Sequence, residues 1–212
     1  MIMKQYFFVF LFSLLTCANI HAQQRKGKVF FPETSFNIQA ATNALEKGNA
    51  TIEGVVFVKR NDVSPLLKGS KAYGANVQVV LFPVTDYFKD WHKMRKKRET
   101  KHNRVYMSEE AVKYHIATTT DSEGRFKFTN LKPGEYFMQT FVGYYTEKFA
   151  DHYRGSDSYT YGGTRYITNY YEREDYLITN SERIEEFVTI KSDNETVKIK
   201  LNKKVPVGGV LE

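Results

Sequence analysis

The chain has 212 residues, a formal net charge of +7 and a single cysteine. This length suits one domain with a sizeable core, and one cysteine excludes a fold that is held together by internal disulfides. The sequence contains neither a glycine-rich phosphate loop nor a Gly-x-Ser-x-Gly nucleophile elbow. We therefore expect no nucleotide cofactor and no serine-hydrolase chemistry.

Residues 1–22 are predicted to be a secretory signal. Lys4 precedes an apolar run, and Ala22 ends a plausible cleavage site. The run is too short for a stable membrane span. An alternative is lipidation of Cys17, although Thr16 is larger than the residue that usually precedes a lipoprotein cysteine. We expect an exported protein, periplasmic or secreted, which contacts a membrane only if the cysteine is lipidated.

Residues 23–50 are predicted to form a lead-in segment before the main domain, residues 51–212. The stretch 37–45 favours a short helix, with Gly48 as its C-terminal stop. We expect this helix to cover one open end of the domain.

Short runs of alternating apolar residues follow from residue 52 to residue 201, and this period of two predicts β-strands. The run Asp121-Ser-Glu-Gly124 has hairpin-turn chemistry, with Gly124 available for positive φ. A second turn is expected at Pro133-Gly134, which fixes φ at the proline and frees it at the glycine. About seven strands separated by such turns predict one antiparallel sandwich.

Three motifs stand in order along this region: Gly74-Ala-Asn-Val-Gln-Val79, Thr120-Asp-Ser-Glu-Gly-Arg-Phe-Lys-Phe128 and Leu131-Lys-Pro-Gly-Glu-Tyr136. Together they resemble the carboxypeptidase regulatory-like domain, a transthyretin-like sandwich. The resemblance covers most of the chain after residue 50 and implies an all-β, Ig-like antiparallel fold of seven strands. In this family the module is often accessory, so the resemblance implies no particular activity.

The family pattern is interrupted at residues 86–112. Asp86 is expected to cap a helix with Phe88, Trp91 and Met94 or Arg95 along one side, and 108–112 suggests a second short helix. Residues 89–104 hold eight basic residues against two acidic ones, while the charges elsewhere in the mature chain balance. The candidate contacts for an anionic partner are Lys93, Arg95, Lys96, Lys97, Arg98, Lys101 and Arg104.

Such a basic helix suits lipopolysaccharide, an acidic glycan, extracellular DNA or an acidic protein. The alternative is a solvated charged helix that Trp91 anchors to the sandwich.

A second insertion, residues 144–176, contains nine tyrosines among small polar residues. Gly162-Gly163 predicts the tip of a hairpin, because a two-glycine turn tolerates positive φ at both positions. Tyrosine mixed with Ser, Gly and Asn is typical of binding loops and suits a glycan or a protein surface. In the alternative, the tyrosines only pack the hairpin against the sandwich. The aromatic contact candidates are Tyr159, Tyr161, Tyr166, Tyr170 and Tyr171.

No metal site or other cofactor is predicted. The histidines at 92, 102, 115 and 152 have no H-x-H or H-E-x-x-H spacing. Intradiol dioxygenases resemble the sandwich motifs, but the histidine pair that would hold iron is missing after Tyr136. Domains with a lysine–asparagine isopeptide bond need a buried acid where this chain has Thr140, so a bond between Lys59 and Asn202 is not expected.

The sequence therefore predicts a non-enzymatic binding or adhesion module that contacts an anionic or glycan surface through the basic helix and the tyrosine-rich hairpin. The alternative is a structural or assembly subunit of a cell-envelope complex, with another envelope protein as partner. An enzyme would require His92, His102 or His152 to converge with carboxylates.

Overall fold

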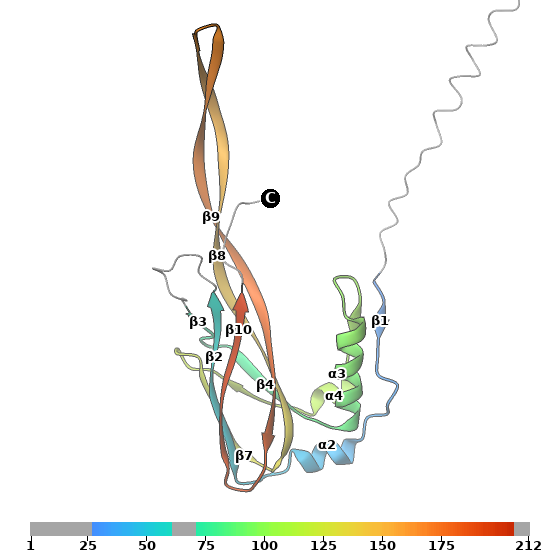
Figure 1. The fold of residues 1–212 in the computed structure, drawn as a ribbon. Coiled ribbons are helices and arrows are strands. Elements are labelled where there is room, and N and C mark those ends of the chain that lie inside the picture. The colour runs from blue at the N-terminus through green and yellow to red at the C-terminus, as the bar shows by residue number, and fades with distance from the viewer. Residues whose placement is uncertain (1–26, 61–70, 206–212) are drawn as a thin grey trace, which may run out of the picture.

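The computed structural model describes residues 27–60 and 71–205 (Figure 1). The predicted signal and Cys17 lie outside these residues. The elements in chain order are β1 (Val29–Phe30), α2 (Ile38–Ala44), β2 (Ala50–Arg60), β3 (Lys71–Tyr73), β4 (Gln78–Pro83), α3 (Asp86–Arg98), β5 (Arg104–Val105), α4 (Glu109–Lys113), β6 (Ile116–Thr119), β7 (Arg125–Leu131), β8 (Gly134–Tyr161), β9 (Thr164–Ile190) and β10 (Thr196–Val205).

Two four-stranded sheets face each other. The first sheet has the order β10-β2-β3, with β7 also pairing with β2, and the second has the order β6-β4-β8-β9. The prediction of a mainly β sandwich is confirmed. The strand number differs, since the described residues form eight strands in the two sheets and two more in a small β1–β5 ribbon.

One pairing in the sandwich is parallel rather than antiparallel. The last strand, β10, runs alongside β2 through ten register pairs from Thr196 opposite Thr51 to Val205 opposite Arg60. The short connection after β9 carries the chain across to the first sheet, so that β10 arrives in the direction of β2. The expectation of a wholly antiparallel sandwich was wrong for this strand.

The core lies between the two sheets and follows the period of two. Alternate residues of β2, such as Ile52 and Val56, are fully buried, as are Val79 and Leu81 of β4. Gly54 interrupts this row on β2, and a Cβ there would lie 2.9 Å from the ring of Phe126. The missing side chain leaves room for that ring.

The first predicted turn is confirmed in detail. Gly124 has a φ of 74°, and Asp121 Oδ1 accepts hydrogen bonds from the amides of Glu123 (2.9 Å) and Arg125 (2.8 Å). The same carboxylate accepts a hydrogen bond from Arg125 Nε through Oδ2 (2.7 Å). This bond, together with those from the backbone amides, lowers the pKa of Asp121.

The second predicted turn differs from the expectation. Gly134 begins β8 and is paired with Ile190, so its backbone is already extended. The left-handed residue before the turn is Asn130, with a φ of 61°. Asparagine tolerates this conformation better than most residues with a side chain.

The predicted lead-in helix is confirmed as α2, which lies at one end of the sandwich (Figure 1). Tyr136 ties it there, since its hydroxyl donates towards the carbonyls of Ala44 (3.1 Å) and Lys132 (2.9 Å). The C-cap of the helix is Leu45 and not Gly48. Gly48 instead permits close approach to β7, because a Cβ there would lie 2.2 Å from the Leu131 carbonyl oxygen.

The first insertion forms α3 and α4, as predicted. The cap of α3 is Thr85, whose hydroxyl accepts from the amide of Phe88 (3.3 Å), and not Asp86. Asp86 is the first helical residue, where its negative charge favours the helix N-terminus. Phe88 and Trp91 pack against Phe137 on the outer face of the second sheet, so the expected apolar side of the helix is confirmed.

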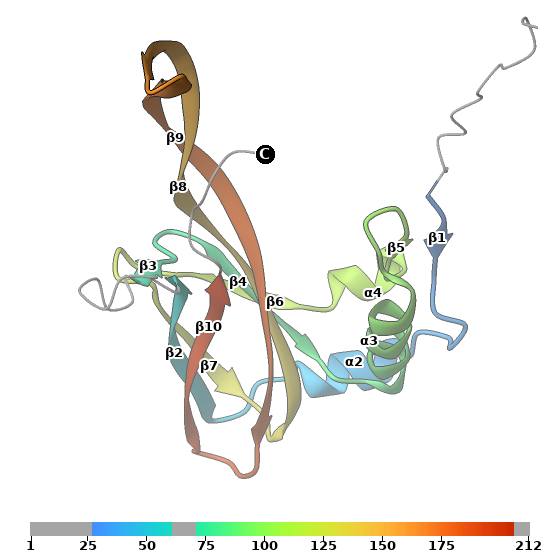
Figure 2. The same cartoon turned by 45° about the horizontal axis from the view of Figure 1, so that its top comes forward.

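The second insertion is part of a hairpin longer than predicted. Strands β8 and β9 contain 28 and 27 residues and continue beyond the sandwich as a twisted two-stranded arm (Figures 1 and 2). The run from Tyr145 to Tyr161 would span roughly 55 Å at the usual rise of a strand. The predicted tip is confirmed, since Gly162 and Gly163 have φ values of 59° and 80°. In the described ranges no helix has the length and apolar composition needed to cross a bilayer.

Candidate functional site

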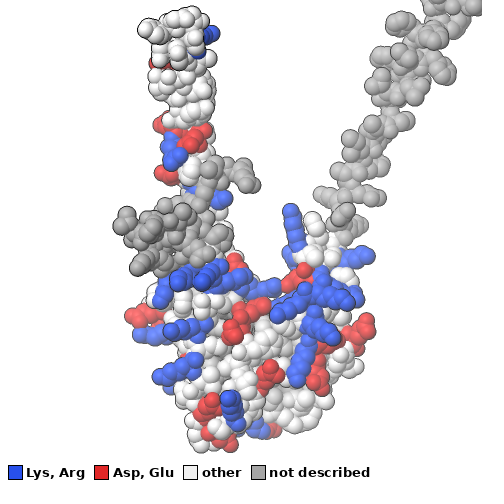
Figure 3. Space-filling view, viewed as in Figure 1, with Lys and Arg blue, Asp and Glu red and all other residues white. Residues whose placement is uncertain are grey.

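Six of the seven predicted basic residues are exposed on or just after α3. We call them the helix surface: Lys93, Lys96, Lys97, Arg98, Lys101 and Arg104. Trp91 anchors this helix, because its indole Nε1 donates to the Val105 carbonyl (3.3 Å) while its ring is buried. Figure 3 shows Lys and Arg side chains gathered over this part of the molecule.

Arg95 was wrongly predicted to contact an anionic partner. It is only 4% exposed, and its Nη2 lies 2.5 Å from Glu185 Oε2 on β9. The guanidinium carbon lies 4.4 Å from the centre of the Trp91 ring, which adds a cation–π contact. The side chain is on the buried side of α3 and binds the protein itself.

Arg95 belongs to a four-residue ionic network that joins α3 to β9. Glu99, at the end of the helix, accepts a hydrogen bond from Arg183, with Nη2 2.7 Å from Oε2. Arg183 Nε lies 3.2 Å from Glu185 Oε1. Two positive and two negative side chains balance here. The network therefore fixes the helix without adding to the net charge of the helix surface.

The histidines do not form a metal centre in the described part of the chain, where no three His, Cys, Asp or Glu side chains group together. His92 lies among aromatic rings, with its ring centre 4.9 Å from that of Phe187. Burial, followed by the charges of Arg95 and Lys96, lowers the pKa of His92. This histidine therefore favours its neutral form.

Four of the five predicted tyrosines share one face of the projecting arm. Register places Tyr159 opposite Tyr166, and Tyr161 and Tyr170 follow at even spacing along the same face. We call Tyr159, Tyr161, Tyr166 and Tyr170 the tyrosine face. The rings of the opposed pair are stacked, with centres 5.1 Å apart and planes at 14°.

The side chains of the tyrosine face are open to solvent. Tyr161 is 78% exposed and Tyr159 is 63% exposed, so the alternative in which these residues pack against the sandwich is wrong for them. The hydroxyl of Tyr170 donates to Asp157 Oδ2 (2.9 Å), which orients that ring. Tyr171 lies on the opposite face beside Tyr153 and does not join the group.

A further basic surface lies on the outward face of the first sheet, where sequence reasoning did not place one. Register aligns its side chains in three rows across β10, β2 and either β7 or β3. The rows are Lys198–Glu53–Lys127, Lys200–Val55–Arg125 and Lys204–Lys59–Lys71. We call the seven basic residues of these rows the lysine face. Figure 3 shows basic side chains over β2, β3 and β10 as well as over α3.

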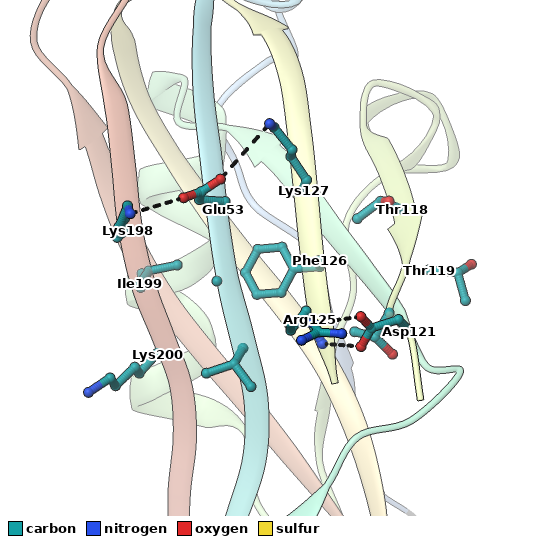
Figure 4. Close-up of a pocket in the computed structure, with 13 residues that line it drawn as sticks. Glu53, Thr118, Thr119, Asp121, Arg125, Phe126, Lys127, Lys198, Ile199 and Lys200 are labelled. Atoms are coloured by element: carbon teal, nitrogen blue, oxygen red, sulfur yellow. Dashed lines mark hydrogen bonds and ion pairs between the residues drawn. The ribbon is translucent and has the colours of Figure 1, made fainter. Parts of the chain in front are cut away.

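A hollow of about 780 Å³ lies over the first two rows (Figure 4). Its lining includes Thr118 and Thr119 from β6 together with the strands of the first sheet. Glu53 lies between two lysines, 3.4 Å from the ammonium of Lys198 and 3.9 Å from that of Lys127. One carboxylate thus faces two ammonium groups.

The sequence does carry a signal for this surface. In Val197-Lys-Ile-Lys-Leu201 the lysines occupy the positions opposite to the core, and the alternation was used only to predict a strand. The net charge outside residues 89–104 did not reveal this surface, because acidic residues, among them Glu53 and Asp121 beside it, offset these cations in the sum.

No protein-family model and no curated protein matches the chain. A solved structure with a similar fold is that of a "putative carbohydrate binding protein" from Pseudomonas aeruginosa, with 19% sequence identity and a TM-score of 0.50. The likeness covers 80% of this chain and 99% of that one. At this identity it shows a shared fold, a mainly β sandwich.

Proposed function

We propose that the chain is an exported, non-enzymatic binding module of the transthyretin-like type, and that its tyrosine face binds a glycan. The observation that carries the proposal is the position of four exposed tyrosines on one face of an arm that projects from the sandwich. An arm of this length places the rings away from the body, where a polymeric surface can reach them.

Tyrosine suits this task for physical reasons. Its ring offers a flat apolar area for the C–H face of a sugar, while its hydroxyl bonds to the sugar hydroxyls. Only two side-chain torsions are fixed on binding, so the entropic cost is small. The stacked pair Tyr159 and Tyr166 and the hydrogen bond of Tyr170 to Asp157 already restrict these torsions.

The helix surface supports the same proposal by attracting acidic polymers. Six exposed cations concentrated along α3 and the following loop create a positive potential that extends about 8–10 Å at moderate salt. Their contribution would fall as salt rises. The P. aeruginosa protein of similar fold, named for carbohydrate binding, favours a glycan over other partners.

A second candidate function is that of an assembly subunit that binds another envelope protein. It is favoured by the face of the arm opposite the tyrosine face, where Ile167 is 59% exposed and Leu177 68% exposed. Tyr145 and Tyr153 lie on that same face. One exposed apolar side chain is ordinary surface, but several along one face of the arm suit a contact with another protein.

Two matched triple variants separate the candidates. Tyr159, Tyr161 and Tyr166→Ser removes three rings from the tyrosine face, whereas Tyr145, Tyr153 and Tyr171→Ser removes three from the opposite face. Retention of each protein is measured by affinity electrophoresis in gels that contain neutral or acidic polysaccharides. We expect the first variant to lose at least about tenfold in affinity, which is about 1.4 kcal/mol, and the control to lose little.

Equal retention of both variants, or no retention of the natural protein in any gel, would overturn the glycan proposal. Co-purification with one protein that survives high salt and is lost only in the opposite-face variant would establish the second candidate.

A further inference from the structure

We propose that the lysine face is a separate binding site for a linear acidic polysaccharide, one that carries carboxylate or sulfate groups on successive sugars. The site belongs to the outer surface of the first sheet and not to the arm, so it stands whether or not the tyrosine face binds a glycan.

The row Lys204–Lys59–Lys71 carries the argument furthest. Register places these three lysines side by side on adjacent strands, on the same face of the sheet. Side chains paired in this way have Cβ atoms about 4.5–5.5 Å apart, and like charges at that distance destabilise the sheet. A bound polyanion would offset this repulsion.

The row Lys198–Glu53–Lys127 also leaves a positive charge uncompensated, although its arrangement differs. Glu53 is shared by the two lysines at 3.4 and 3.9 Å, so it orients both ammonium groups but balances only one of them. The side chain of Lys198 is 80% exposed, which leaves the ammonium open to a second anion.

The spacing of the rows suits an extended polymer. Rows on one face of a strand repeat every two residues, about 6.6 Å, so the distance from Lys198 to Lys204 on β10 is roughly 20 Å. Four rows fall within this distance, and the third, Asn202–Phe57–Tyr73, carries no charge. A linear chain that follows β2 would meet cations on either side at the other three rows, where Arg125 is already paired with Asp121 and Glu123. The hollow of about 780 Å³ over the first rows, with the hydroxyls of Thr118 and Thr119 at its rim, has the size of an ordinary ligand site.

The composition of the face favours a polysaccharide over other polyanions. Single-stranded nucleic acids are held by stacking on several aromatic rings. Here Tyr73 is half-exposed at one end, while Phe57 is buried beneath Lys71, whose ammonium lies 4.9 Å from the ring centre. Membrane surfaces are held by apolar side chains that insert among the lipids. Among its described residues the face offers them Val55, half-buried between Lys200 and Arg125, and the half-exposed Tyr73.

The test compares two variants of the complete chain that lose the same three charges. Lys198, Lys200 and Lys204→Gln changes the lysine face, and Lys47, Lys113 and Lys191→Gln removes three exposed charges outside both the lysine face and the helix surface. Affinity for heparin and for polygalacturonate is measured by titration at several salt concentrations, with dextran as the uncharged control. We expect at least a tenfold loss for the lysine-face variant and less than a threefold loss for the control variant.

A gain-of-affinity variant guards against misfolding as an explanation. Glu53→Gln removes the carboxylate from the first row and is expected to tighten heparin binding about threefold, with a steeper salt dependence. Thermal unfolding should show that the lysine-face variant is at least as stable as the natural protein, since it relieves like-charge contacts.

Equal losses in the two charge variants would reduce the effect to net charge and overturn the proposal. Tighter binding of a single-stranded oligothymidylate or of anionic lipid vesicles than of either polysaccharide would assign the face to another partner and overturn it as well. The triple Tyr→Ser variant of the tyrosine face should keep the salt dependence of heparin binding, which the lysine-face variant should lose, so failure of the arm and failure of this face are distinguishable.

Discussion

The guanidinium of Arg95 lies 2.5 Å from the carboxylate of Glu185 and joins α3 to β9. The arginine is almost fully buried, while its neighbours Lys96 and Lys97 are exposed. One turn of a basic helix thus contains two kinds of cation, one that holds the fold together and others that face solvent.

Replacing Arg95 by Met should destabilise the protein, because it leaves Glu185 with one partner fewer in a poorly hydrated place. We expect a loss of about 2–4 kcal/mol in the free energy of unfolding, below the upper range for buried pairs because Glu185 keeps some exposure. The control Lys97→Met, on the exposed side, should change stability by less than about 0.5 kcal/mol. Urea unfolding measures both, and equal values would contradict the structural role.

Stability should fall as pH is lowered from about 8 to about 5.5, in part because of His92. Burial and nearby cations lower its pKa in the folded state below the ordinary value of 6.5. The unfolded chain therefore binds the proton more readily, and stability present above pH 6.5 is lost as the pH falls towards the folded pKa. His92→Gln should flatten this part of the profile of thermal unfolding midpoints; an unchanged slope would show that other groups cause it.

Gly54→Ala should destabilise the sandwich by about 1–3 kcal/mol, as overpacking of a core does. The added Cβ would lie 2.3 Å from the Ile199 carbonyl oxygen and 2.9 Å from the Phe126 ring, so the sheet must shift. Gly143→Ala is the matched control, because its nearest neighbour, the Asn180 carbonyl oxygen, is 3.9 Å away. Chemical unfolding of both variants checks the difference, and similar values would refute the packing argument.

The arm should be dispensable for folding. Replacing residues 147–177 by Asn-Gly joins Thr146 to Ile178, which are paired in the hairpin and suit a two-residue turn. The core cluster contains Val142 and Ile184 but no residue of the deleted stretch. We expect cooperative unfolding with a midpoint within about 5 °C of the natural protein. Loss of the cooperative transition would show that the arm contributes to the core.

Local patterns predicted those features that depend on neighbours in the chain. The two-glycine tip at residues 162–163 and the turn at Gly124 follow from backbone conformations that few other residues adopt. The apolar side of α3 follows from helical spacing, so Phe88 and Trp91 were placed correctly.

Features that depend on distant segments were beyond such patterns. Helical spacing allows Arg95 to lie on the side of Trp91, but the local sequence shows no partner for its charge, which is Glu185, remote in the sequence. The row Lys204–Lys59–Lys71 comes from three separate strands, and only the sheet order brings them together. Because periodicity assigns a residue to a face but does not identify its neighbours, this surface required the structure.

The parallel pairing of β2 with β10 has a mechanical consequence. A force that pulls the start of β2 away from the end of β10 acts along both strands and tends to slide one past the other. All ten register pairs from Thr51 to Arg60 then resist together, instead of opening one after another from an end. A protein held by its C-terminal side while its N-terminal side bears a load would therefore yield in shear, the direction in which a sheet is strongest.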